Sequence, residues 1–463
     1  MAAKLPDSFS GVVPSLALKA ELGPPRSECG VGALMPFAGR LWAVSYVSHK
    51  SHTGVGTGLY EIDEDLNITR RPESVVGTFN NRLFHWATNQ IVIGPHVIDE
   101  KHNVRTVDEL REVRVCGTAM HLHEPDRLVY MLGMEGEIFE LDVNTLVCNQ
   151  VFDLQQILKT EGEGQTHFKD CFTADGRLVV CSNEYHEPDF LGQRAQGRLA
   201  EFDGQAWTII ERKPYVGLQA LRGFGGAAAL FAIGWDQASA LLSVHTAERG
   251  WVRYRLPKAS HCFDHKWQTE WPRIREVEHE RLLMDCHGMF YELSPHAYAG
   301  HIWGVRPIST HLWVVPDFCS WLGMLVMGSD NASCHGRDGN LLTAEPMSGM
   351  WLGKTDDLWQ FGRPAGWGGP WWQTAVQAGE PSDPYLMTGF ARKGLHLTHD
   401  ADGAVRFTVE VDFMGHGQWA RYDTITVDAG GYAHHAFPAG FGAHWVRVMA
   451  DTDCHATAQL HYT

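Results

Sequence analysis

The chain has 463 residues, of which 44% are hydrophobic and 20% are charged. These fractions are close to those of an average globular protein, so they exclude a disordered or collagen-like chain. The 38 Lys and Arg residues against 55 Asp and Glu leave a net charge of −17, which disfavours a protein that follows a phosphate backbone. No apolar run reaches the roughly 18 residues of a membrane span.

The first residues carry no recognisable targeting signal. Residues 1–28 lack the charged start and the apolar core that mark a secretion signal, and residues 1–13 are expected to form a flexible N-terminus. The ten cysteines include no CxxC pair, which disfavours a zinc ribbon or thioredoxin-like site and favours a reduced compartment. We therefore expect a cytoplasmic protein, or a secreted one whose signal has been removed.

Short runs of β-forming residues, each bounded by Gly, Asn, Asp or Pro, recur along the chain and predict an all-β fold. One unit repeats, a glycine followed by a strand that ends in an acidic residue; it occurs at residues 56–63, 134–143, 196–204, 286–295 and, more loosely, 356–364. Partner strands are expected at residues 90–99, 126–133, 176–183 and 310–317. Short helices or single turns are expected only at residues 107–113 and 154–160.

Repeated units of three or four strands indicate a propeller or a solenoid. Dividing 463 residues by a repeat of roughly 60 gives between seven and eight units. We therefore predict a single domain over residues 1–463, a seven-bladed β-propeller whose four-stranded antiparallel blades surround a central channel. Two stacked β-sandwiches are the alternative, which is disfavoured because no Pro/Ser/Gly-rich linker divides the chain.

Several segments gather polar side chains among turn residues. They contain His49, then Asn81, Arg82 and His85, then His167 and Lys169, then Trp271 and Arg273, and finally Arg306. Loops of successive blades converge at one end of a propeller, so these side chains could surround one pocket. Arginine pairs bidentately with carboxylates and tryptophan stacks on sugar rings, which suits an anionic sugar. Taken singly, a histidine beside aromatic residues is more often a hydrogen-bonded core residue.

At these segments the sequence resembles a family of carbohydrate-active enzymes. The stretches that carry the resemblance include SECGVGALMPFAGRLWAVSYVSHK, PESVVGTFNNRLFH, QIVIGPHVID, EWPRIREVE and MDCHGMFYEL. They are similar to seven-bladed propeller enzymes that remove terminal L-rhamnose from α-1,4-linked D-glucuronate on arabinogalactan-type glycans, a family with both lyases and hydrolases. The resemblance implies His49 as the hydrolase residue on one face, and His85 with His167 for a lyase on the other.

The sequence favours β-elimination, the chemistry of a rhamnose-glucuronate lyase. Arg82, Arg273 and Arg306 would neutralise the uronate carboxylate, and His85, with His167 as second group, would transfer the protons. Asn81, Lys169 and Trp271 would complete the substrate site. Paired carboxylates, which hydrolysis normally needs, do not stand out.

Two alternatives stay open, an α-L-rhamnosidase acting through His49 and a non-catalytic sugar-binding propeller. The lyase chemistry requires no cofactor, and a structural Ca²⁺ ion in the central channel is left open. The expected partner is a glycan or oligosaccharide that contains uronic acid, not a nucleic acid or a membrane.

Overall fold

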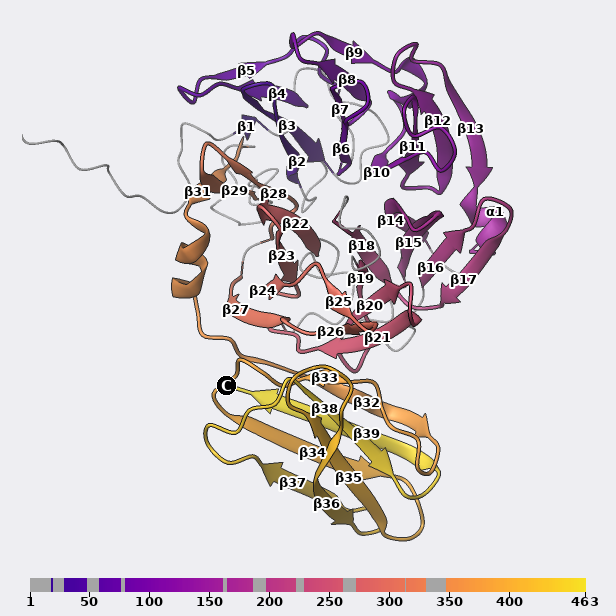
Figure 1. Ribbon diagram of the computed structural model, residues 1–463, viewed down its shortest axis with the longest axis vertical. Helices are drawn as coiled ribbons and strands as arrows, with labels where there is room; N and C mark the ends of the chain where they lie inside the picture. The colour runs from indigo at the N-terminus through magenta and orange to yellow at the C-terminus, as the bar shows by residue number, and fades with distance from the viewer. Residues whose placement is uncertain are drawn as a thin grey trace, which may run out of the picture. The chain divides into compact units, whose positions relative to one another are not determined.

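The structure is a computed structural model that describes residues 18–19, 29–47, 58–75, 80–160, 165–185, 197–221, 229–260, 272–312, 314–329 and 347–463. Nearly all of its regular elements are β-strands (Figure 1). The chain divides into two compact units, residues 1–154 with 313–358 and residues 155–312 with 359–463. Within the described ranges, no helix is both long and apolar enough to span a membrane.

The first unit contains four sheets, each made of strands that follow one another along the chain with antiparallel neighbours. Their strands are β2 (Cys29–Phe37), β3 (Arg40–Val47), β4 (Leu59–Ile62) and β5 (Ile68–Arg70); β6 (Arg82–His85), β7 (Gln90–Ile93), β8 (His96–Asp99) and β9 (Val104–Thr106); β10 (Val115–Met120), β11 (Leu128–Gly133), β12 (Glu137–Asp142) and β13 (Cys148–Asp153); and β28 (Phe318–Trp321), β29 (Met324–Gly328) and β31 (Met350–Gly353). A short pair, β1 (Leu18–Lys19) and β30 (Met347–Ser348), accompanies them.

The second unit begins with three sheets of the same kind. Their strands are β14 (Gln165–Ala174), β15 (Arg177–Tyr185), β16 (Gly197–Phe202) and β17 (Trp207–Glu211); β18 (Tyr215–Gln219), β19 (Leu230–Trp235), β20 (Ala240–Thr246) and β21 (Gly250–Leu256); and β22 (Arg273–Glu278), β23 (Arg281–Cys286), β24 (Met289–Leu293) and β27 (Arg306–Thr310). A hairpin of β25 (Ala297–Tyr298) and β26 (His301–Ile302) lies between β24 and β27 in the chain. The short helix α1 (Leu154–Leu158) confirms the turn expected at residues 154–160.

From Gly366 onward the sheets are built differently. One sheet has the order β32 (Gly366–Val376), β39 (Cys454–Tyr462), β34 (Lys393–His399), β37 (Tyr432–Ala436), and the other has the order β33 (Tyr385–Leu386), β38 (Trp445–Ala450), β35 (Val405–Asp412), β36 (Ala420–Val427). Apolar side chains of both sheets, such as Leu397 and Val409, belong to one buried cluster, as in a β-sandwich. The second sheet continues from β21, because Arg255 bridges to Tyr385.

The acidic residue at the end of the repeated sequence unit forms the turn to the next strand. Asp63 accepts hydrogen bonds from the backbone N–H groups of Asp65 and Asn67 at 3.0 and 2.8 Å. Asp99 and Asp142 cap their turns in the same way, through N–H groups two to four residues further on. Short polar side chains that bond to nearby N–H groups stabilise tight turns, so the repeated acid is a structural device.

Three expectations about individual strands need correction. Residues 356–364, expected as a strand, form the 3₁₀ helix η4 (Thr355–Gln360) and a connection beyond it. Residues 310–317, expected as a partner strand, belong to no strand after Thr310 in the part that the structure describes. Residues 90–99 form two strands, β7 and β8, because Gly94 (φ 57°) and Pro95 turn the chain between them.

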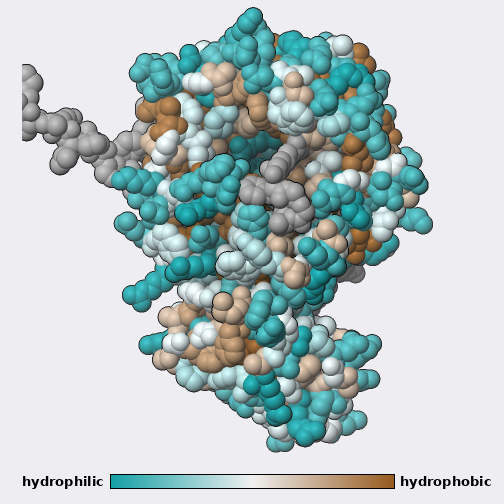
Figure 2. Space-filling model, in the orientation of Figure 1, coloured by the Kyte–Doolittle hydropathy of each residue, from teal (hydrophilic) through white to brown (hydrophobic). Residues whose placement is uncertain are grey.

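The face of the molecule in view in Figure 2 is mainly polar. Figure 2 shows hydrophilic side chains over most of the face in view, with hydrophobic residues in scattered groups. Residues 107–113 contain the 3₁₀ turn η2 (Asp108–Leu110), as expected. The predicted flexible N-terminus, residues 1–13, lies outside the described residues.

Candidate functional site

Three predicted residues lie on β6 or immediately before it, and all three have structural partners. His85 is completely buried, and its Nδ1 lies 2.8 Å from Thr88 Oγ1 across the turn that ends β6. Asn81 is buried and donates from Nδ2 to Gly94 O and Thr118 Oγ1, at 3.0 and 2.8 Å. Both side chains hold neighbouring segments together instead of facing a solvent-filled site.

Arg82 is engaged by a buried carboxylate. Its Nε lies 3.1 Å from Asp317 Oδ2, and its Nη2 donates to Phe318 O at 3.1 Å. Asp317 also accepts the backbone N–H of Leu34 at 2.8 Å. The guanidinium therefore links β6 to the segment that leads into β28, and its charge is already matched within the fold.

Two further predicted residues lie on a strand of the second unit that carries a buried acid. His167 and Lys169 are buried on β14, next to Asp170. Burial raises the pKa of Asp170, against the opposing charges of Arg275 and Arg273. Asp170 Oδ2 accepts the N–H of Leu218 at 3.0 Å, just as Asp317 accepts that of Leu34. Asp170 therefore links the sheet that contains β14 to β18, the first strand of the next sheet.

Arg273 shares this structural role. It is buried, and its Nη1 donates to Pro272 O at 2.8 Å and to Val216 O at 3.3 Å. Thus Arg273 faces a buried acid, whereas His167 and Lys169 are buried on the strand that carries this acid. His49 and Trp271 lie outside the described residues, so their predicted roles stay predictions.

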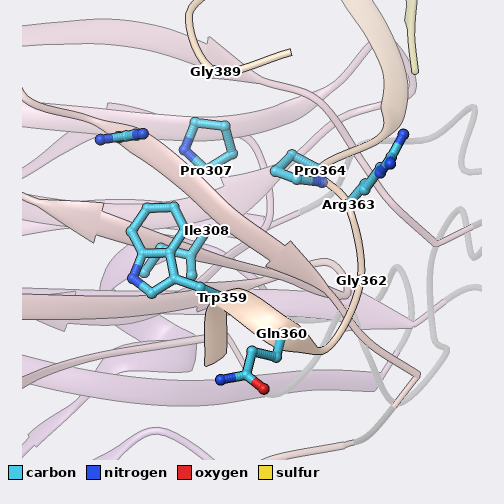
Figure 3. A pocket seen from close by; sticks show the side chains of 9 residues that line it. Pro307, Ile308, Trp359, Gln360, Gly362, Arg363, Pro364 and Gly389 are labelled. Atoms are coloured by element: carbon cyan, nitrogen blue, oxygen red, sulfur yellow. The ribbon is translucent and has the colours of Figure 1, made fainter. Parts of the chain in front are cut away.

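Arg306, a predicted site residue, lines a pocket. A pocket of about 360 Å³ opens beside β27 (Figure 3), and it is lined by Arg306, Pro307, Ile308, Trp359, Gln360, Gly362, Arg363, Pro364 and Gly389. The Arg306 guanidinium lies over the indole of Trp359, 4.9 Å from the ring centroid. Trp359 remains 43% exposed, so part of its ring is accessible to a ligand.

Local backbone geometry holds the wall of the pocket. The N–H of Thr310 donates to Gly362 O at 3.3 Å, and Thr310 Oγ1 donates to Arg363 O at 3.2 Å, so residues 362–363 run against the edge strand β27. Gly389 has φ 86°, and a Cβ there would lie 2.6 Å from Pro307 Cγ. Only glycine permits this approach.

The pocket is cationic in a chain of net charge −17. Among the residues that the structure describes, neither Arg306 nor Arg363 forms an ion pair. Glu292 stands opposite Arg306 in the β24–β27 register, yet the two side chains are not paired. The pocket therefore offers two guanidinium groups, an exposed indole and two prolines.

Sequence reasoning missed Trp359 and Arg363 because residues 356–364 were interpreted as a strand. The signal against that interpretation was present in the sequence FGRP, since glycine and proline two residues apart are typical of a turn or connection. No three His, Cys, Asp or Glu side chains in the described ranges form a ready metal site. The Ca²⁺ ion considered for the central channel stays a prediction.

Comparison with known proteins gives structural neighbours only. No family model matches the chain, and no curated protein is similar to it. The structure of U3-55K is similar with a TM-score of 0.42 and 8% identity, covering 74% of this chain and 100% of that chain. The WD40 repeats of RRP9 are similar with a TM-score of 0.43 and 8% identity, covering 74% of this chain and 99% of that chain. The β-propeller domain of Cps50 (Swd1) from Myceliophteria thermophila is similar with a TM-score of 0.38 and 12% identity, covering 74% of this chain and 99% of that chain. These neighbours are WD40-type propellers.

The predicted function is corrected by these findings. None of these three neighbours is described as a carbohydrate lyase or hydrolase. The predicted rhamnose-glucuronate lyase, with the rhamnosidase as its runner-up, is therefore wrong, and the resemblance extends to the propeller fold alone. The expected glycan partner is corrected as well, since the comparisons give no evidence for glycan binding.

Replacing His85 with alanine is expected to lower the free energy of unfolding by about 1–3 kcal/mol, because Thr88 Oγ1 loses its buried hydrogen-bond partner. Urea denaturation at pH 7 measures the loss. His279→Ala, at an exposed position, is the control and should leave the midpoint unchanged. A His85→Ala variant as stable as the wild type would show that this imidazole does not support the fold.

Proposed function

We propose that this chain is a non-catalytic propeller protein that binds an acidic segment of a protein partner in the pocket beside β27. The observation that carries the proposal is a pocket with two arginines that have no ion-pair partner among the described residues: Arg306, which lies over the exposed ring of Trp359, and Arg363, which lines the pocket beyond Pro364 (Figure 3). Arginine and tryptophan are the residue types most often found at the energetic centre of protein interfaces.

The chemistry of the pocket favours a carboxylate next to an apolar side chain. A guanidinium presents paired N–H donors that match both oxygens of a carboxylate, while Trp359, Pro307 and Pro364 offer apolar surface. A volume of about 360 Å³ suits one or two side chains. Because the rest of the chain is strongly acidic, other surfaces repel an acidic segment, and the pocket concentrates it.

The number of propeller blades and the division into domains also belong to the proposal. We infer that the seven sheets of consecutive strands between Cys29 and Gly353 are the blades of a seven-bladed propeller, and that residues 366–463 form a separate β-sandwich domain. The number of sheets and their strand order support the first inference. The change to sheets of non-consecutive strands supports the second, which replaces the single domain expected over residues 1–463.

An array of short peptides tests the binding proposal. The array pairs each sequence containing Asp or Glu beside Leu, Phe or Trp with its Asn or Gln counterpart, and it is probed with the full chain at two salt concentrations. Binding is expected for the acidic members only, and to weaken as the salt concentration rises. Equal binding of acidic and amide peptides, or no binding to any acidic member, would overturn the proposal.

A further inference from the structure

Three histidines lie on one face of the sheet that contains β34, β37 and β39. His396 on β34 is directly opposite His434 on β37, and His461 on β39 is opposite Gly394, two residues before His396. Side chains two residues apart on a strand share a face, and diagonal neighbours on adjacent strands come within reach. The register therefore places three imidazoles around one point of this sheet.

Gly394 leaves the space in which these rings meet. A Cβ at this position would lie 3.0 Å from His434 Nε2, so the His434 ring leans over the glycine toward the strand that carries His461. The ring centroids of His396 and His434 are 4.9 Å apart, and those of His396 and His461 are 5.0 Å apart. Two imidazoles that share a tetrahedral zinc ion, with Zn–N of about 2.0–2.1 Å, have centroids about 5.3 Å apart.

We propose that His396, His434 and His461 form a binding site for a late first-row divalent metal ion, Zn²⁺, Ni²⁺ or Cu²⁺. Imidazole nitrogen favours these ions, whereas Ca²⁺ and Mg²⁺ prefer oxygen ligands. The site is not preformed, since no three metal-binding side chains in the described ranges are already arranged for an ion. An ion bound there would require the exposed side chains of His434 and His461 to rotate toward His396.

Tyr432 prepares the central ligand. Its hydroxyl lies 2.7 Å from His396 Nδ1, which orients the ring and leaves Nε2 for the metal, as outer partners of metal-binding histidines commonly do.

Isothermal titration of the untagged full chain with ZnCl₂ at pH 7.5 tests this site. The wild type is expected to bind one more Zn²⁺ ion per chain than the His396→Gln/His434→Gln/His461→Gln variant. Single His434→Gln and His461→Gln variants are expected to lose at least about tenfold in affinity, as even outer-shell substitutions cost about 10–100-fold. Both positions are exposed, so the variants should fold, which thermal melting verifies.

His455→Gln is the matched control. His455 is exposed on the same strand, but it pairs with Asp400 at 2.9 Å and lies six residues from His461, about 20 Å along the strand. This variant should bind zinc as the wild type does. Equal zinc binding by the wild type and the triple variant, or an equal loss in His455→Gln and His461→Gln, would overturn the proposal.

Discussion

Replacing Asp317 with alanine is expected to lower the free energy of unfolding by about 3–5 kcal/mol, the cost of removing one member of a buried ion pair. The Asp317 carboxylate is completely buried, and Oδ2 lies 3.1 Å from Arg82 Nε and accepts the Leu34 N–H at 2.8 Å. Alanine removes this acceptor from both groups at once. Urea denaturation at pH 7 measures the loss.

Two further variants separate the ion pair from the backbone hydrogen bond. Asp317→Asn keeps an oxygen for the Leu34 N–H and should lose less stability than Asp317→Ala. In a double-mutant cycle with Arg82→Met, we expect a coupling energy of about 0.5–3 kcal/mol. A loss below about 1 kcal/mol in Asp317→Ala would contradict the structural role assigned to this pair.

Replacing Asp236 with alanine is expected to cost a similar amount, about 3–5 kcal/mol. Asp236 is buried between two cations, with Oδ2 2.5 Å from Lys213 Nζ and Oδ1 2.9 Å from Arg255 Nη1. Its Oδ1 also accepts the N–H groups of Ala238 and Ser239 at 3.0 and 3.1 Å. Alanine leaves the buried Arg255 with Asp383 as its remaining carboxylate, at 2.7 Å. Urea denaturation of both proteins at pH 7 measures the loss.

The contribution of Asp236 also depends on pH. Burial alone would raise the pKa of Asp236, but Arg255 and Lys213 outweigh it and hold this pKa well below the usual 3.8. A carboxyl group whose pKa is lower in the folded state stabilises the fold above its unfolded-state pKa, and this stabilisation disappears as the pH falls. The stability gap between wild type and Asp236→Asn should therefore narrow below about pH 4. A constant gap between pH 7 and pH 3 would contradict this.

The sequence predicts the strands better than the way in which the last sheets combine. Glycine before a strand and an acid after it are local signals, and Asp63, Asp99 and Asp142 act locally by capping their own turns. The sandwich after Gly366 depends on pairing between strands far apart in the chain, such as β32 with β39. No local pattern encodes that pairing.

The candidate site was predictable only in part, for a physical reason. Polar residues such as Asn81, Arg82 and His85 look the same in a sequence whether they bind a substrate or satisfy buried backbone groups. Their role is decided by distant partners, as Asp317 decides that of Arg82. Arg306 lines the pocket, but its neighbour Trp359 belongs to the 3₁₀ helix η4 and Arg363 to the connection that follows this helix, and neither was expected from the sequence.

A binding titration tests the central claim, that the chain binds an acidic protein segment through the pocket beside β27. An acidic peptide that binds on the array is labelled with a fluorophore, and its fluorescence anisotropy is measured as each protein is added. The proteins are the wild type and the pocket variants Arg306→Ala and Trp359→Ala. The controls are Arg421→Ala and Trp372→Ala, at exposed positions outside the pocket. Both pocket variants are expected to weaken binding about 30-fold, the effect of an interface hot spot, and both controls to bind as the wild type does. Equal affinity of the wild type and the two pocket variants would contradict the claim.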